Sequence, residues 1–167
     1  MEGPEYQDVI AQVNARLGFR GSNQLSADEV LAVWEVCRFE KNSDLTLPSP
    51  MCAAFSVANN QILEYQPDLD YYYRTGYGVP NRRLVENINC ELMQDMLRFL
   101  QSNNPNEPTA RIYGTHSQNL HLFFVTLGIF EDLDPLTRHN IAQQINRQWR
   151  TSWITPKGGN MAVVRYE

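Results

Sequence analysis

The stretch ARIYGTHSQNLHLFFVTLGIF, residues 110–130, decides how the second half of this sequence folds. Residues 110–113 have the composition of a short strand, and the apolar segment 118–127 predicts a buried helix soon after it. His116 lies at the junction between the two. We therefore expect a histidine at the carboxyl end of a strand, which is where open α/β sheets bind ligands.

The predicted helix start behind His116 indicates a site for an anion. The first N–H groups of a helix lack partners within the helix, and the helix dipole favours negative charge at that end. We interpret His116 as a hydrogen-bond donor to phosphate, and the alternative is a strand-end histidine bonded to a backbone carbonyl. His121 lies about 140° further around the helix, so we do not expect both histidines to contact one phosphate.

The first hundred residues have helical periodicity throughout. Gly18 ends the first predicted helix, and Ser26 with Glu29 forms a capping box at the start of the second. The loop SNNPNEP, residues 102–108, separates this part from the rest. The helices expected here are 5–17, 26–40, 56–76 with a break at Pro67, and 83–101.

Beyond that loop the pattern changes to short strands and helices. We expect strands at 110–113 and 161–166, and helices at 118–127 and 140–149. Two strands this far apart cannot form a stable sheet alone. The predicted fold class is therefore a partial α/β fold. In it, residues 1–104 are a helical portion and residues 105–167 are the C-terminal portion of an α/β core whose other strands are missing from this chain.

Composition excludes several classes of protein. The 167 residues carry a net charge of −5 with Lys and Arg scattered, so a nucleic-acid partner is not expected. The apolar runs are shorter than the ~18 residues of a membrane helix, and the acidic, polar start does not resemble a signal peptide.

Three cysteines, Cys37, Cys52 and Cys90, have no metal-binding spacing, and we expect neither a metal nor a cofactor. Buried free thiols are the favoured interpretation, while one disulfide with one free thiol stays open for a secreted protein.

Several blocks in order resemble one family. SPMCAAFS is followed by LEYQPDLDYYYRTGYG, then IYGTHSQNL with LGIFEDLDPL, then WRTSWITPKGGNMAVVRYE. These blocks resemble the branch 2 histidine phosphatases and, among them, the C-terminal two-fifths of the multiple inositol polyphosphate phosphatases. The resemblance implies an α/β core built from both ends of a longer chain, with a helical domain inserted between them.

The resemblance also implies a mechanism. A histidine in an N-terminal R-H-G-x-R-x-P motif attacks phosphorus, a late histidine completes the phosphate pocket, and an acid one or two residues after it protonates the leaving group. His116 falls on the late histidine. Gln118 falls on the position of the proton donor, and an amide cannot supply that proton. The nucleophile motif is absent, since Arg138-His139 lacks its glycine, second arginine and proline.

Other residues are interpreted structurally. Asn160 is expected to form a turn, and Asp68 and Asp70 to be helix-start and surface acids. The remaining candidates are tyrosines expected to pack the helical part and arginines expected to be solvated: Tyr71, Tyr72, Tyr73, Tyr77, Arg74, Arg82 and Arg83.

By resemblance, the function is that of a phosphomonoesterase acting on inositol polyphosphates or other phosphate monoesters, incomplete or degenerate in this chain. A non-catalytic binder of phosphate esters and a helical protein-interaction module are the alternatives. The family suggests the secretory pathway: the lumen of the endoplasmic reticulum, the extracellular space or a membrane-associated location. The chain itself does not indicate which.

Overall fold

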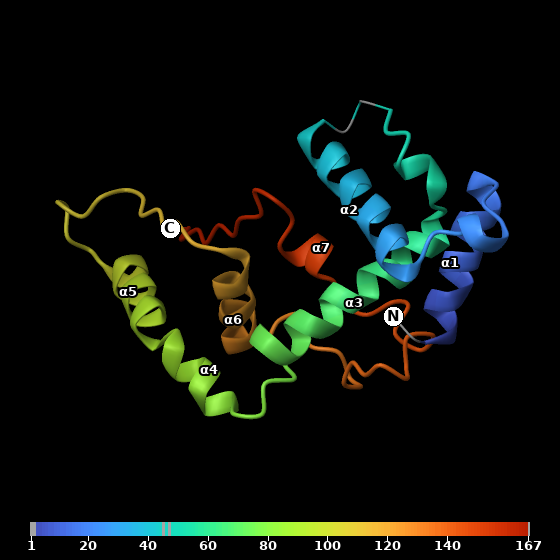
Figure 1. The fold of residues 1–167 in the computed structure, drawn as a ribbon. Coiled ribbons are helices and arrows are strands. Elements are labelled where there is room, and N and C mark those ends of the chain that lie inside the picture. The colour runs from blue at the N-terminus through green and yellow to red at the C-terminus, as the bar shows by residue number, and fades with distance from the viewer. Residues whose placement is uncertain (1–2, 45, 47, 167) are drawn as a thin grey trace. The chain divides into compact units, whose positions relative to one another are not determined.

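The computed structural model describes residues 3–44, 46 and 48–166, and the regular structure in them is helical. Figure 1 shows coiled ribbons joined by irregular segments, with no arrow among the described residues. The elements are α1 Pro4–Leu17, η1 Gly21–Asn23, α2 Ala27–Ser43, η2 Cys52–Ala54, α3 Val57–Thr75, α4 Arg82–Ile88, α5 Cys90–Gln101, α6 Ser117–Leu127 and α7 Thr151–Ile154, where η marks a 3-10 helix.

The chain forms two compact units. The first is Met1–Pro67 with Arg138–Ile145, and the second is Asp68–Thr137 with Asn146–Glu167. The predicted boundary between residues 104 and 105 follows the organisation of the family rather than compactness, and it stays a prediction.

The first unit buries one apolar face each of α1 and α2. Val9 and Val13 of α1 pack in one cluster with Val30 and Trp34 of α2. The Ser26–Glu29 capping box is confirmed, because the Ser26 side chain accepts from Glu29 N and the Glu29 carboxylate accepts from Ser26 N. Gly18 ends α1 at a φ of 79°, a conformation that costs glycine little.

A disulfide between Cys37 and Cys52 joins α2 to η2 in the same unit. The prediction of buried free cysteines is therefore wrong, because Cys37 and Cys52 are bonded and Cys90, although free, is exposed. The open alternative, one disulfide with one free thiol, is the one found, since Cys90 is free and exposed. Spacing along the chain did not predict this pairing, because the pairing depends on the packing of η2 against α2.

The second unit is built around Trp149, which is fully buried. The Tyr72 and Tyr77 rings meet it edge to face, at centroid distances of 6.2 and 5.7 Å. Helix α4 packs on α6, where Arg82 donates to the Val125 carbonyl at 2.8 Å. The expectation that these two tyrosines pack against the interior is confirmed. Arg82 is partly exposed, as expected, and also donates to the Val125 carbonyl.

The strand prediction is wrong. Residues 110–116 and 159–166 run without helix, turn or bend, but no strand occurs among the described residues. The reason is that a strand needs a partner with which to exchange backbone hydrogen bonds, and neither segment makes such bonds. Among the described residues, the predicted strand–helix–helix–strand piece therefore consists of α6, the short helix α7 and two segments without regular secondary structure.

The predicted helix over 140–149 is also absent. Gln144 N donates to the Asn140 and Ile141 carbonyls, so this part forms irregular turns. Further on, the Asp132 carboxylate accepts the backbone N–H groups of Gln148 and Trp149. Tertiary hydrogen bonds therefore take the donors that a helix would use.

Two helix boundaries also differ from prediction. Helix α3 continues through Pro67 although proline removes one hydrogen bond, because buried Leu63 and Tyr72 anchor the helix on both sides of it. The predicted 83–101 helix is two helices, divided at Asn89. The Asn89 amide donates to Thr126 at 2.9 Å, and this tertiary contact accompanies the break.

Candidate functional site

His116 is the N-cap residue of α6, and its side chain is exposed. Its backbone is extended, with φ −102° and ψ 160°, and its carbonyl accepts from Asn119 N at 3.0 Å and Leu120 N at 3.3 Å. Within the described residues the imidazole makes no hydrogen bond. The predicted position at a helix start is confirmed, whereas the expected strand before it is a segment without regular secondary structure.

The first turn of α6 offers free donors beside this histidine. The N–H groups of Ser117 and Gln118 have no acceptor among the described residues, and neither side chain makes a hydrogen bond. Because α6 continues to Leu127, its dipole adds partial positive charge at this end. The arrangement is able to bind an anion but contains no acid at Gln118.

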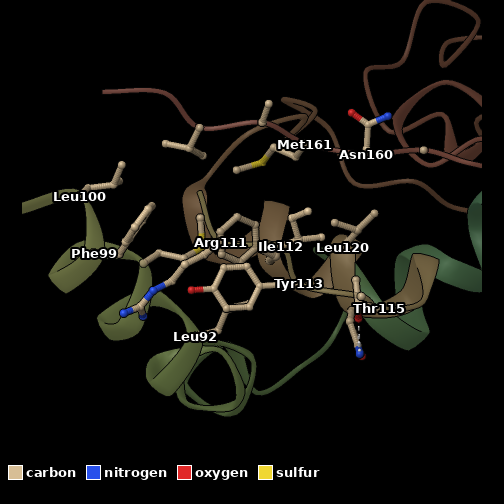
Figure 2. A pocket seen from close by; sticks show the side chains of 17 residues that line it. Leu92, Phe99, Leu100, Arg111, Ile112, Tyr113, Thr115, Leu120, Asn160 and Met161 are labelled. Atoms are coloured by element: carbon tan, nitrogen blue, oxygen red, sulfur yellow. Dashed lines mark hydrogen bonds between the residues drawn. The ribbon is translucent and has the colours of Figure 1, made fainter. Parts of the chain in front are cut away.

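A cavity of about 550 Å³ lies in the second unit beside this helix start. Figure 2 shows Leu92 and Phe99 of α5 on one side and Met161 and Asn160 of the C-terminal segment on another. Its walls are mainly apolar, and His116 and Gln118 are not among its lining residues. A phosphate ester would find few polar partners there, so the cavity and the anion site are different features.

A few polar groups line the edge of this cavity. Thr115 accepts from the Asn119 amide at 2.7 Å, next to His116. The Asn160 amide donates to the Gly158 carbonyl at 3.3 Å, as expected for a turn residue, and its side chain also lines the cavity. The structure thus brings Asn160 to the cavity wall without a contact to His116.

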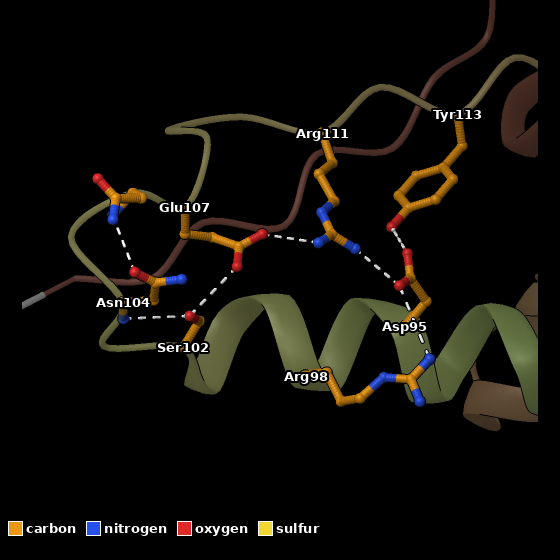
Figure 3. A network of polar contacts seen from close by, with 8 residues as sticks. Asp95, Arg98, Ser102, Asn104, Glu107, Arg111 and Tyr113 are labelled. Carbon is orange, nitrogen blue, oxygen red and sulfur yellow. Dashed lines mark hydrogen bonds and ion pairs between the residues drawn. The ribbon is translucent and has the colours of Figure 1, made fainter.

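Arg111 lines the cavity, and among the described residues it already has ion-pair partners (Figure 3). Its guanidinium contacts Asp95 at 2.7 Å and Glu107 at 2.6 Å, and the Tyr113 hydroxyl donates to Asp95 at 2.5 Å. The Tyr113 and Arg111 hydrogen bonds hold the pKa of Asp95 below its ordinary value. This network fastens segment 107–113 to α5. The guanidinium of Arg111 is therefore already paired with two carboxylates.

Arg138 and His139 belong to the first unit, whereas α6 belongs to the second. Arg138 Nε donates to His139 Nε2 at 2.9 Å, and both side chains are exposed on an irregular segment of the first unit. Arg74 pairs with Asp70 at 3.0 Å on the surface, as expected for a solvated pair.

Sequence reasoning missed the most buried polar cluster of the second unit. Asp68 was expected near the surface, yet its side chain is fully buried against Arg147, and its Oδ1 accepts from Thr151 N at 2.8 Å. Burial raises the pKa of Asp68, against the lowering effects of Arg147 and the Thr151 hydrogen bonds. No local signal marks this pairing, because the partners lie 79 residues apart.

His121 is fully buried and belongs to the core rather than to the anion site. Its two ring nitrogens face the hydroxyls of Thr75 at 3.2 Å and Thr155 at 2.6 Å. Burial lowers the pKa of His121 to about 4. The prediction that His121 does not share the phosphate of His116 agrees with this buried position.

Neither a membrane-spanning helix nor a metal-binding cluster occurs among the described residues. No helix there is long and apolar enough to cross a membrane. No group of three or more His, Cys, Asp or Glu side chains in that part of the chain is arranged to hold a metal ion.

Comparison with known proteins gives the family. The sequence model of the histidine phosphatase superfamily (branch 2) matches residues 4–167. This chain belongs to that superfamily.

The chain is similar to proteins named as inositol polyphosphate phosphatases and to a phytase. The chain is 33% identical over 162 residues to multiple inositol polyphosphate phosphatase 1 of Drosophila melanogaster, covering 97% of this chain and 33% of the relative. It is 30% identical over 174 residues to the Homo sapiens protein of the same name, and the match covers 98% of this chain and 34% of that relative. Phytase A of Aspergillus terreus is 28% identical over 153 residues, and the match covers 80% of this chain and 33% of the phytase. The chain thus spans about a third of the length of these relatives, and no solved structure gives a significant match.

Proposed function

We propose that the start of α6 is the phosphate-binding half of a phosphomonoesterase site, with His116 as donor to a phosphate oxygen. The observation that carries the proposal is the exposed, unbonded imidazole at the N-cap of an eleven-residue helix whose first N–H groups are open. Membership of the histidine phosphatases supports it, because that family has a late histidine in its phosphate pocket and His116 is the residue of this chain that resembles it.

The substrate class follows from the names of the relatives. Several of them are inositol polyphosphate phosphatases, and one is a phytase, so inositol polyphosphates or other phosphate monoesters are the proposed ligands. An imidazole N–H and two backbone N–H groups supply neutral or charge-assisted hydrogen bonds to phosphate oxygens. No metal or other cofactor is needed for this binding.

Chemistry at this site is limited by Gln118. An amide does not deliver a proton to a leaving alkoxide, and loss of general acid catalysis typically costs ~10²- to 10⁴-fold in rate. The 167 residues also contain no R-H-G-x-R-x-P motif. This chain alone therefore binds phosphate esters without turnover.

Calorimetry with myo-inositol hexakisphosphate tests the binding. The native chain should bind it, His116→Ala should weaken binding about tenfold or more for the loss of a charge-assisted hydrogen bond, and the matched control His139→Ala should bind as the native chain does. Equal affinity of the native chain and His116→Ala would refute the role of His116.

Release of phosphate from myo-inositol hexakisphosphate or p-nitrophenyl phosphate should not exceed that in buffer. Turnover by the native chain that His116→Ala abolishes would contradict the binding-only conclusion and require another nucleophile.

A second candidate function is that of a family member that binds phosphate esters but does not hydrolyse them even when the nucleophile motif is present. Gln118 favours this candidate, because it lacks the acid that the reaction needs. In a longer polypeptide that also contains the nucleophile motif, Gln118→Glu should raise the rate by ~10²- to 10⁴-fold if the lost acid is the main defect. An unchanged rate would favour the non-catalytic candidate.

The proposed location is the secretory pathway. The Cys37–Cys52 disulfide supports it, because disulfides persist in oxidising compartments. Alkylation of unreduced protein from its source should label Cys90 alone. Labelling of Cys37 and Cys52 as well would indicate a reducing compartment.

A further inference from the structure

His121 is the first buried residue of α6 and follows the candidate phosphate donor, His116, by five positions. Residues 117–120 are at least partly exposed, whereas His121 is fully buried. The other hydrogen bonds that join α6 to distant side chains end at residues 124–126, in its last turn. Within the described residues, His121 is therefore the hydrogen-bonded anchor nearest the start of this helix.

The ring of His121 lies between two threonines of other segments. Its Nδ1 is 3.2 Å from Oγ1 of Thr75, the last residue of α3, and its Nε2 is 2.6 Å from Oγ1 of Thr155, which directly follows α7. All three residues belong to the second unit. One side chain thus joins α6 to two other parts of that unit.

The two distances indicate which ring nitrogen carries the proton. Burial lowers the pKa of His121 to about 4, so the ring is neutral at neutral pH and has one donor and one acceptor. Because hydroxyl donors make shorter hydrogen bonds than N–H donors, Thr155 is the donor to Nε2, and Nδ1–H donates to Thr75. The Thr75 hydroxyl then donates to the Tyr71 carbonyl at 3.3 Å. The Thr151 carbonyl, the other acceptor near the Thr155 hydroxyl, already accepts from Thr155 N.

We propose that His121, as its Nδ1–H tautomer, is a positioning residue that holds the start of α6, and with it His116, against α3 and the residue that follows α7. The inference rests on the proposed phosphate site at the start of α6. His116 and His121 are about one and a half helical turns apart, so a fixed ring at 121 fixes the direction of the first N–H groups of the helix. Without this anchor the helix start must be ordered when the anion binds, and that cost lowers the affinity.

Calorimetry with myo-inositol hexakisphosphate tests the positioning. His121→Leu keeps a large apolar side chain without the hydrogen bonds and should weaken binding roughly two- to tenfold, the equivalent of one net hydrogen bond. His121→Gln keeps a donor and an acceptor and should restore most of the affinity. The control Thr126→Val removes the hydroxyl that accepts from Asn89 at the far end of α6, and it should lower stability without changing the affinity.

Equal affinity of the native chain and His121→Leu would overturn the proposal. If His121→Leu does not fold, Thr155→Val provides the same test, because it removes the donor to Nε2 and keeps the branched shape of the side chain. This variant should also bind more weakly than the native chain, and an unchanged affinity would overturn the proposal as well.

Two NMR measurements test the anchor without the phosphate ligand. The ring ¹⁵N chemical shifts of His121 should be those of the Nδ1–H tautomer, and an Nε2–H tautomer would overturn the assignment. The Leu120 N–H, which donates to the His116 carbonyl, should exchange with solvent faster in His121→Leu than in the native chain. Its rate should rise by a larger factor than that of the Ile129 N–H, which donates to the Phe124 carbonyl at the far end of the helix. An equal rise at both ends would show global destabilisation and overturn the positioning role.

The two kinds of measurement separate this inference from the proposed function. A native chain that does not bind the hexakisphosphate would refute the phosphate site, and the exchange rate of the Leu120 N–H would still decide whether His121 holds the helix start. A native chain that binds it, with unchanged affinity and exchange in His121→Leu, would refute the positioning role alone.

Discussion

Asp68 and Arg147 form an ion pair in the interior of the second unit, with Arg147 Nε 2.8 Å from an Asp68 carboxylate oxygen. The other carboxylate oxygen accepts from the Thr151 hydroxyl at 2.6 Å, and Trp149 Nε1 donates to the Asp68 carbonyl at 3.2 Å. Through its carboxylate and its backbone carbonyl, Asp68 of α3 thereby fixes the path of segment 147–151. The pair joins parts of the chain that are distant in sequence.

Asp68→Asn should destabilise the chain strongly. It removes the counter-charge of a buried guanidinium, and breaking one partner of a buried ion pair typically costs ~3–5 kcal/mol in free energy of unfolding. The matched control is Asp70→Asn, which breaks the exposed pair with Arg74 and should cost under ~1 kcal/mol. Urea unfolding followed by circular dichroism measures both, and similar losses in the two variants would contradict the structural role of Asp68.

Gly76→Ala should also destabilise the second unit. A Cβ at Gly76 would lie 2.6 Å from Trp149 and 2.8 Å from the Tyr72 backbone, so the helix end and the core must separate. Overpacking of this kind typically costs ~1–3 kcal/mol. Gly114→Ala is the control, because nothing lies within 4 Å of its added Cβ. Thermal unfolding should show a lower Tm for Gly76→Ala alone, and equal Tm values would show that this contact relaxes without cost.

The parts of the fold that sequence predicted well depend on neighbours along the chain. Gly18 and the Ser26–Glu29 box mark helix ends by local conformation and local hydrogen bonds, and both are found as predicted. His116 at the start of a helix was predicted for the same reason. Local signals were sufficient at these positions.

The parts that failed depend on contacts between distant segments. Residues 110–113 have strand composition but find no partner strand within the part of the chain that the structure describes, so composition alone predicted the wrong state. The predicted 140–149 helix loses its donors to Asp132, and Asp68 finds Arg147 79 residues away. No short-range pattern encodes these pairings.

The disulfide predicts a redox effect on the first unit. Cys37 and Cys52 are 15 residues apart, and closing a loop of that length stabilises a protein by about 3 kcal/mol in the chain-entropy account. Cys37→Ser, or reduction with dithiothreitol, should therefore lower the free energy of unfolding, while Cys90→Ser should leave it nearly unchanged because Cys90 is free and exposed. Unfolding of oxidised and reduced protein in urea gives the difference, and an equal midpoint would mean that α2 and η2 hold together without the bond.

The burial of His121 predicts that the free energy of unfolding falls in mild acid. Its ring faces the Thr75 and Thr155 hydroxyls and the Tyr71 and Trp149 rings, and no charged group within the described residues stabilises an imidazolium there. Burial lowers the pKa of His121 to about 4 in the folded chain, against about 6.5 when unfolded. Between these values the unfolded state binds a proton that the folded state does not, so the stabilising difference is complete above pH 6.5 and is lost as pH falls toward 4.

The free energy of unfolding lost in this way is at most roughly 3 kcal/mol, which is the equivalent of the difference between the two pKa values of His121. His121→Gln retains a donor and an acceptor for the two threonines but does not titrate, so it should remove this component of the pH dependence while lowering stability at neutral pH. His139→Gln, a substitution of an exposed histidine, is the control and should keep the native slope. Urea midpoints at several pH values between 4 and 7 measure the slope, and a His121→Gln profile parallel to that of the native chain would show that another group causes the acid sensitivity.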